Sequence, residues 1–183
     1  VIVGNSEAPV NPYVIDGYRV MGALAEDEEL MKLDASDQCD HRRACRPFSS
    51  NAGFTVAEAS VWIVLMDDEL AMQHGAQIMG SVGDVFVNAD GYKKSIPGPG
   101  IGNYLTVEKA VASARAILGE DLLRTGTYMQ AHGTGTPQNR VTESHILNEV
   151  AQKFGLERWL VGAVKCYVCL LYTSDAADEA CCV

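Results

Sequence analysis

The residues best suited to chemistry lie in one short segment, between Gln130 and Glu143. His132 follows a short apolar stretch and opens a glycine-rich turn, and the end of a strand is where α/β proteins usually expose their working residues. Glycines let the backbone of such a turn approach a ligand closely. The turn alternates glycines with hydroxyl-bearing residues: Gly133, Thr134, Gly135 and Thr136. Taken alone, this pattern fits several functions, because histidine has structural as well as catalytic roles.

Two other groups of residues could carry chemistry. Lys165 follows a predicted strand, and by itself it is expected to be a surface lysine whose alkyl stem lies along apolar surface. Cys39, His41 and Cys45 share one charged stretch, and cysteine and histidine are the usual ligands of zinc. This set lacks a fourth partner, so the sequence favours a solvated loop and predicts no metal site.

The elements that must position His132 are predicted on both sides of it. A strand is expected at residues 127–130, a glycine-rich turn at 131–137 and an amphipathic helix at 141–154, which Gly155 ends. A further strand at 161–164 leads into Lys165. Glu143 then stands in the first turn of the helix, where a carboxylate is also favoured by the helix dipole.

The rest of the chain alternates strands with helices. Further strands are predicted at residues 1–4, 61–66 and 76–87. Helices are expected at 12–24, at 67–74 before Gly75, and at 109–118, capped by Thr106 and ended by Gly119. A surface excursion is expected at 26–45 and a loop at 91–103. Because the strands at 1–4 and 61–66 are apolar throughout, we expect α/β layers around a buried mixed sheet.

Composition excludes several classes of protein. The 183 residues are 48% hydrophobic and 21% charged, which rules out a disordered chain. A net charge of −10 argues against nucleic-acid binding. The apolar runs are shorter than the ~20 residues that cross a membrane, and no signal peptide is visible at the first residues. The six cysteines are scattered, which argues against a disulfide scaffold.

The whole sequence resembles the β-ketoacyl synthases, condensing enzymes of the thiolase-like fold. Residues 132–137 match the family's His-Gly-Thr-Ser/Gly-Thr-Pro turn at every position. Residues 3–8 resemble its Gly-Gly-x-Glu-Ala strand end, and residues 46–58 its Arg-Pro-Phe segment. Residues 161–165 resemble the strand that delivers its active-site lysine. The resemblance extends over residues 1–168 and implies a layered α/β/α thiolase-like fold, present here as the end of the first half and most of the second.

The resemblance implies a decarboxylative Claisen condensation. In the family, a cysteine carries an acyl chain as a thioester, and a malonyl thioester on acyl carrier protein loses CO₂ and attacks it. Two histidines donate hydrogen bonds to the malonyl thioester oxygen, which is stabilisation of developing charge by fixed donors. The resemblance further implies a cytoplasmic enzyme of fatty acid or polyketide synthesis. It implies a homodimer that acts with acyl carrier protein and needs no cofactor or metal.

Individual roles are carried over by the motif. His132 matches the first of the two histidines, and Lys165 matches the lysine that supports the pair. Glu143 matches the carboxylate that holds this lysine through a charge-assisted contact. Thr134 and Thr136 match the threonines that bind the pantetheine arm.

The sequence also departs from the family. The nucleophilic cysteine is expected upstream of Val1, and the second histidine is expected in a Gly-His pair where Cys169 and Leu170 stand. We therefore expect a fragment that is inactive by itself. Ser49 and Arg140 stand where aspartates are common.

The end of the chain has a different character. Residues 169–179 can be read as the translation of a string that looks like a transposase sequencing adapter. This predicts that residues 169–183 are a non-native tail, and that the C-x-x-C at Cys166 and Cys169 has no functional meaning.

Two alternatives stay open. The parent protein could be a non-condensing homologue, such as a chain-length partner without the cysteine. It could also be a non-enzymatic acyl-binding module in which His132 is structural.

Overall fold

The computed structural model describes residues 1–90, 100–168 and 170–171. Its elements along the chain are β1 (Ile2–Glu7), α1 (Pro12–Val20), α2 (Asp27–Asp34), the 3-10 helix η1 (His41–Arg43), β2 (Val56–Ala57), β3 (Ala59–Val64), α3 (Asp68–Gln73), α4 (Ile101–Leu118), α5 (Glu120–Gly126), β4 (Tyr128–Gln130), α6 (Pro137–Phe154), β5 (Leu160–Gly162), α7 (Lys165–Val168) and β6 (Leu170–Leu171). Apart from Leu170 and Leu171, the expected tail lies outside the described residues.

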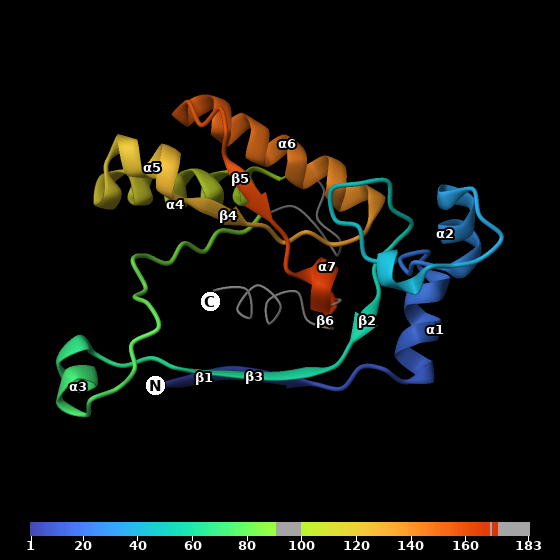
Figure 1. Ribbon diagram of the computed structural model, residues 1–183, viewed down its shortest axis with the longest axis horizontal. Helices are drawn as coiled ribbons and strands as arrows, with labels where there is room; N and C mark the ends of the chain where they lie inside the picture. The colour runs from blue at the N-terminus through green and yellow to red at the C-terminus, as the bar shows by residue number, and fades with distance from the viewer. Residues whose placement is uncertain (91–99, 169, 172–183) are drawn as a thin grey trace.

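The strands pair in twos rather than in one broad sheet. Within the described ranges, β1 pairs antiparallel with β3, β2 pairs parallel with β6, and β4 pairs parallel with β5. The β1–β3 ribbon extends along one side of the molecule, and α4, α5 and α6 gather on the opposite side around β4 and β5 (Figure 1). The predicted alternation of strands and helices is confirmed, but the single buried mixed sheet is not found in the part of the chain described here.

The hydrophobic core lies among α4, α5 and α6. Its buried members are Val111, Leu123, Val150, Phe154 and Leu156. Two contacts reinforce the packing of α4 on α6: the guanidinium of Arg115 lies 4.9 Å above the ring of Phe154, and Lys153 pairs with Glu108 at 2.6 Å. This core fixes the C-terminal half of α6, the helix whose N-terminal end follows the candidate site.

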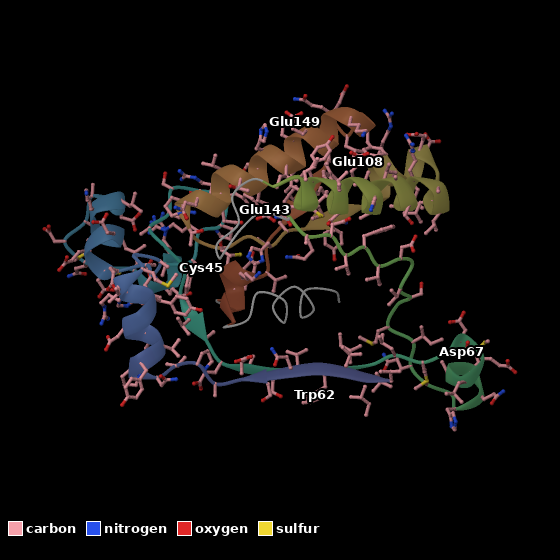
Figure 2. The ribbon with its side chains drawn as sticks, turned by 180° about the vertical axis from the view of Figure 1, so that it is seen from behind. Cys45, Trp62, Asp67, Glu108, Glu143 and Glu149 are labelled. Carbon is pink, nitrogen blue, oxygen red and sulfur yellow. The ribbon has the colours of Figure 1, made fainter. Side chains whose placement is uncertain are left out.

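The β1–β3 ribbon departs from its predicted burial. Both strands form where expected, in the register Gly4 opposite Trp62. Their apolar side chains are nevertheless exposed: Ile2 is 69%, Trp62 62% and Val64 59% accessible. Figure 2 shows Trp62 on this ribbon, away from the helices. The prediction of burial on both faces is wrong for this chain, because no described element packs over either face.

Several element boundaries also differ from expectation. The charged excursion at 26–45 contains α2, in which Leu30 is almost completely buried and the acidic first turn is exposed. Residues 76–90 are irregular rather than a strand, since no described strand lies beside them. The loop expected at 91–103 lies mostly outside the described residues, and α4 begins at its end. Thr106 is therefore inside α4, where its hydroxyl donates to the carbonyl of Gly102 at 2.8 Å.

The helix that follows the glycine-rich turn begins earlier than predicted. α6 starts at Pro137 rather than at residue 141, because Thr136 caps it by accepting a hydrogen bond from the amide of Asn139 at 3.3 Å. Proline suits the first position, where no intrahelical N–H donor is needed. Gly155 ends the helix with a positive φ of 64°, as predicted.

Candidate functional site

The site is built where two parallel strands end side by side. β4 leads into His132, β5 leads into Lys165, and the amide of Ala131 continues the ladder by donating to the carbonyl of Gly162 at 2.8 Å. Because carboxyl ends of parallel strands meet at one edge, His132 and Lys165 come together although 33 residues separate them. The two predicted strands are confirmed, and His132 and Lys165 follow them as expected. The catalytic roles of the two residues stay predictions.

Lys165 is buried against His132. Its side chain is 1% exposed, so it is not the surface lysine that its position alone suggested. Its Nζ lies 2.9 Å from Nδ1 of His132 and donates to the carbonyl oxygen of the same residue at 2.7 Å. An ammonium group has donors and no acceptor. Opposite a charged lysine, Nδ1 must therefore accept, and the ring proton of a neutral His132 resides on Nε2.

Glu143 fixes the backbone of the same turn. From the first part of α6 its Oε1 accepts from the amide of His132 at 2.7 Å, and its Oε2 accepts from the amide of Gly133 at 2.8 Å. Figure 2 shows Glu143 on the inner part of this helix. Hydrogen bonds between a carboxylate and amide donors are charge-assisted and strong. The carboxylate thus holds His132 at its backbone amide, whereas Lys165 holds it at the ring and the carbonyl.

The contact expected between Glu143 and Lys165 is not found among the described residues. Both groups bind His132 instead, Lys165 at its ring and carbonyl and Glu143 at its amide. The roles that the resemblance gives to Glu143 and Lys165 stay predictions. In this structure the N-terminal part of α6 places Glu143 at the backbone amides of His132 and Gly133, where it accepts from two consecutive donors.

Asn139 is a member of the site that sequence analysis missed. Its Nδ2 donates to Oε2 of Glu143 at 2.8 Å. The signal was available, because residues four apart on a helix are neighbours. It was overlooked because the predicted helix began after Asn139.

The two threonines bind each other within the turn. The hydroxyls of Thr134 and Thr136 lie 3.1 Å apart, and Thr134 is buried with 7% of its surface exposed. Thr136 also caps α6. In this structure their hydroxyls stabilise the turn, and their predicted role in binding pantetheine is not tested by it.

The glycines of the turn are required by close packing. Gly133 has a positive φ of 54°, and a side chain there would meet Cβ of Ala163. A side chain at Gly135 would meet the carbonyl of Gly53. The turn therefore packs directly on the segment 46–54 and on the residues between β5 and Lys165.

The segment 46–54 is itself tied down by polar contacts. Nη1 and Nη2 of Arg46 form a bidentate pair with Asp34 at the end of α2, at 2.7 and 2.6 Å. The guanidinium holds the pKa of the Asp34 carboxyl below its usual value, and the carboxylate raises the pKa of Arg46. On the other side of the segment, Nη1 of Arg140 donates to the carbonyl of Ser49 at 2.8 Å.

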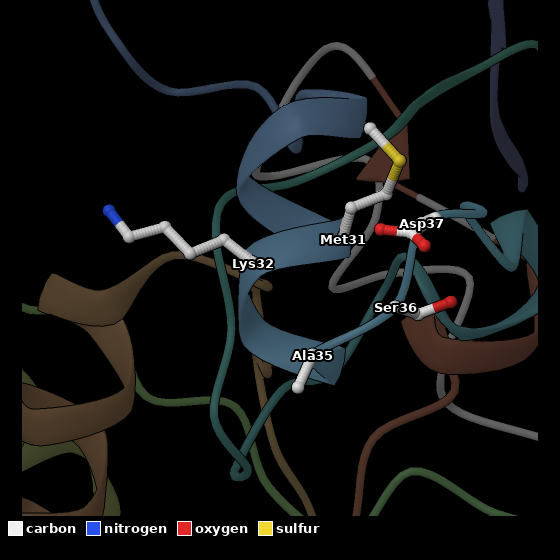
Figure 3. A pocket seen from close by; sticks show the side chains of 5 residues that line it. All are labelled: Met31, Lys32, Ala35, Ser36 and Asp37. Carbon is white, nitrogen blue, oxygen red and sulfur yellow. The ribbon is translucent and has the colours of Figure 1, made fainter.

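A surface hollow of about 460 Å³ lies elsewhere, beside the end of α2 (Figure 3). It is lined by Met31, Lys32, Ala35, Ser36 and Asp37. None of these residues belongs to the site around His132. The hollow offers one amine, one carboxylate and one hydroxyl without a convergent arrangement, so we assign it no chemistry.

Comparison with known proteins finds clear relatives. The chain is 58% identical, over 179 residues, to the β-ketoacyl-[acyl-carrier-protein] synthase FabY of Pseudomonas aeruginosa, covering 98% of this chain and 28% of that protein. It superposes on the crystal structure of the P. aeruginosa ketosynthase FabY with a TM-score of 0.88 and 60% identity, over 92% of this chain and 26% of that one. No protein-family model matches the chain.

A more distant structure shares the fold. It is a ketosynthase described in complex with a type II polyketide acyl-carrier protein, matched with a TM-score of 0.72 and 23% identity over 97% of this chain and 41% of that one. The chain is thus homologous to β-ketoacyl synthases and spans about a quarter of the length of the P. aeruginosa relative. Its mixed α/β architecture is part of the thiolase-like fold, as the sequence predicted.

Proposed function

We propose that this chain is part of a β-ketoacyl-[acyl carrier protein] synthase and that it supplies one of the two histidines that act on the malonyl thioester. The observation that carries the proposal is the contact between buried Lys165 and Nδ1 of His132. Burial of a charged lysine is unfavourable unless the ammonium forms hydrogen bonds, and here the ammonium lies against the imidazole of His132. Such a pairing suits a histidine that must present a proton in a fixed direction.

The condensation needs a donor where negative charge develops. When the malonyl thioester loses CO₂, charge accumulates on the thioester oxygen, and His132 donates to that oxygen from Nε2–H. Lys165 keeps Nδ1 as the acceptor, and Glu143 holds the backbone, so the donor is oriented before the reaction begins. Preorganised donors of this kind are typically worth ~10²–10³ in rate.

The remaining parts of the reaction are also proposals. The acyl group is carried by a cysteine, and the second donor is a second histidine, both from parts of the protein outside residues 1–168. The pantetheine arm of the substrate binds at Thr134 and Thr136. A change of Thr134 to Val tests this, because it removes the hydroxyl, keeps the shape, and should raise KM for malonyl-acyl carrier protein more than it lowers kcat.

Acyl carrier protein is the proposed macromolecular partner, in a cytoplasmic homodimer that uses no cofactor. Support comes from the complex reported for the distant ketosynthase, which is a property of that protein. Among the described residues, no helix is both long and apolar enough to cross a bilayer. Light scattering of the full-length gene product measures the mass of the homodimer, and the same measurement with acyl carrier protein added measures the mass of the complex.

The test of the central proposal is His132→Ala in the full-length gene product. We expect malonyl-acyl carrier protein decarboxylation to fall by ~10²–10³, with the circular dichroism spectrum unchanged. His145→Ala is the matched control, because His145 is an exposed histidine on the same helix, α6, and lies outside the turn. Decarboxylation within twofold of wild type in His132→Ala would favour the non-condensing homologue or the acyl-binding module instead.

We also propose that residues 169–183 are not native to the protein. Part of this range lies within the alignment to the P. aeruginosa relative, so a native origin is the competing outcome. Genomic sequence read across codon 168 distinguishes the two. A Gly-His pair encoded shortly after Val168 supports the proposal, and the codons for residues 169–183 in the genome contradict it.

A further inference from the structure

Three metal-binding side chains meet at the start of α2, well away in the sequence from the site around His132. They are the carboxylate of Asp27, the thiol of Cys39 and the imidazole of His41, and one ligand atom of each lies within 4.8 Å of the others. Oδ1 of Asp27 and Nε2 of His41 are 3.1 Å apart. The sequence had grouped Cys39 and His41 with Cys45. In the structure the third member of the cluster is Asp27 and not Cys45, because the first turn of α2 lies against residues 39–41.

We propose that Asp27, Cys39 and His41 bind a divalent transition metal of the zinc class. Thiolate, imidazole and carboxylate are the three ligand types that zinc takes in proteins, and three of them leave a fourth tetrahedral position for water. Bond lengths of ~2.0–2.3 Å place tetrahedral ligand atoms roughly 3.3–3.8 Å from one another. Because the separations are at most 4.8 Å, the widest has to shorten by at most about 1 Å, which side-chain rotation can supply. Asp27 and His41 have room for such rotation, because 62% and 72% of their side chains are exposed.

The charge around the cluster supports a cation. The carboxylates of Asp27, Asp34 and Asp40 act on the Cys39 side of the cluster, and their negative charge favours a bound cation. It is partly offset by Arg42, which pairs with Asp40, and by Arg46, which pairs with Asp34. On binding, the S–H bond of Cys39 breaks, its proton passes to the buffer, and a metal–sulfur bond forms.

A metal at this position would hold the N-terminal end of α2, the helix that is connected to the candidate site through Asp34 and Arg46. α2 is held at its last residue by the pair between Asp34 and Arg46. The segment that begins at Arg46 packs against the turn, with Pro47 beside Gly133 and Gly53 beside Gly135. A metal at Asp27 would secure the other end of α2, so its expected effect is on stability and not on the chemical step.

Cobalt(II) titration of the 183-residue chain tests the proposal. Cobalt replaces zinc in tetrahedral sites, and bonding to a thiolate gives it an intense charge-transfer band. We expect one equivalent to bind with that band, zinc to displace it, and zinc to raise the unfolding temperature. Every variant is made in a background without the thiols that lie outside the described residues, with serine at Cys169, Cys181 and Cys182.

Variants separate this cluster from the grouping that the sequence suggested. Asp27→Asn, Cys39→Ser and His41→Gln should each weaken zinc binding at least about tenfold, because loss of even an outer-shell partner costs that much. Cys45→Ser is the matched control in the same segment, and His145→Gln is the control for a surface histidine. Both should bind zinc as wild type does.

Three results would overturn the proposal. They are wild-type affinity in Asp27→Asn, loss of binding in Cys45→Ser, and equal affinity in the urea-unfolded chain, which would show binding by isolated thiols and imidazoles. Circular dichroism of each variant excludes loss of binding through unfolding. Because the readout is metal binding rather than condensation, failure here leaves the proposed function of His132 untouched.

Discussion

Replacing Lys165 with methionine should separate the orientation of His132 from its presence. Methionine has a similar length, so it fills the buried space, but it loses both contacts of Nζ, at 2.9 Å to Nδ1 and 2.7 Å to the carbonyl of His132. A hydrogen bond to a charged group contributes ~1.5–3 kcal/mol. If the contact at Nδ1 alone acts on the transition state, its loss corresponds to a decrease of about 10- to 150-fold in rate.

The assay is decarboxylation of malonyl-acyl carrier protein by the full-length gene product. Because Lys165 acts through His132 rather than on the substrate, we expect kcat to fall and KM to change little. Nitrogen NMR of the imidazole adds a readout that a purely structural role would not move: the proton of neutral His132 should reside on Nε2 in wild type and redistribute toward Nδ1 in Lys165→Met.

The matched control is Lys32→Met, since the side chain of Lys32 is 78% exposed on α2 and lies outside the site. It should leave both the rate and the tautomer unchanged. The reasoning fails if wild-type His132 carries its proton on Nδ1, or if folded Lys165→Met retains its full rate.

Two contacts near the turn, and the lack of a Gly-His pair in the sequence, give three further predictions. Glu143→Gln should lower the free energy of unfolding by about 1–3 kcal/mol, because a side-chain amide cannot accept from both backbone N–H groups; a urea titration that finds no change contradicts this. The lowered pKa of Asp34 means that its pairing with Arg46 stabilises the fold above the unfolded pKa of about 3.9 and that this contribution is lost as pH falls through the lower folded value. In Arg46→Met the urea midpoint should no longer show this loss of stability at acid pH. A pH profile of the midpoint equal to that of wild type would show that the pair does not contribute. The isolated 183-residue chain should consume no malonyl thioester, and consumption above the blank that His132→Ala abolishes would show a complete catalytic centre in it.

Local pattern was enough to predict much of the candidate site. The alternation of glycine and threonine after a short strand indicated the turn, and Gly155 correctly marked the end of α6. The start of α6 was predicted too late because Thr136 and Pro137 were assigned to the turn, although they are a helix cap and a first helical residue. That error also concealed Asn139 as a partner of Glu143.

Burial was the least predictable property. Trp62 and its apolar neighbours were expected to be covered on both faces, yet they are exposed on a two-stranded ribbon. An apolar run indicates that the side chains of a strand are suited to burial. Whether they are buried depends on another element of the protein that packs against the strand. Lys165 shows the opposite error, since its type favours the surface and its neighbours bury it.

The sequence by itself determined which residue types stand at the ends of β4 and β5, and hence that an imidazole, a carboxylate and an amine were available. Only the tertiary structure decided how they pair. Parallel pairing of β4 with β5 brings Lys165 to Nδ1 of His132, and the early start of α6 places Glu143 under the backbone amides rather than against Lys165. The same is true of Asp27, which joins Cys39 and His41 through the position of α2. Spacing along a chain fixes neighbours within one element, whereas contacts between elements depend on packing in three dimensions.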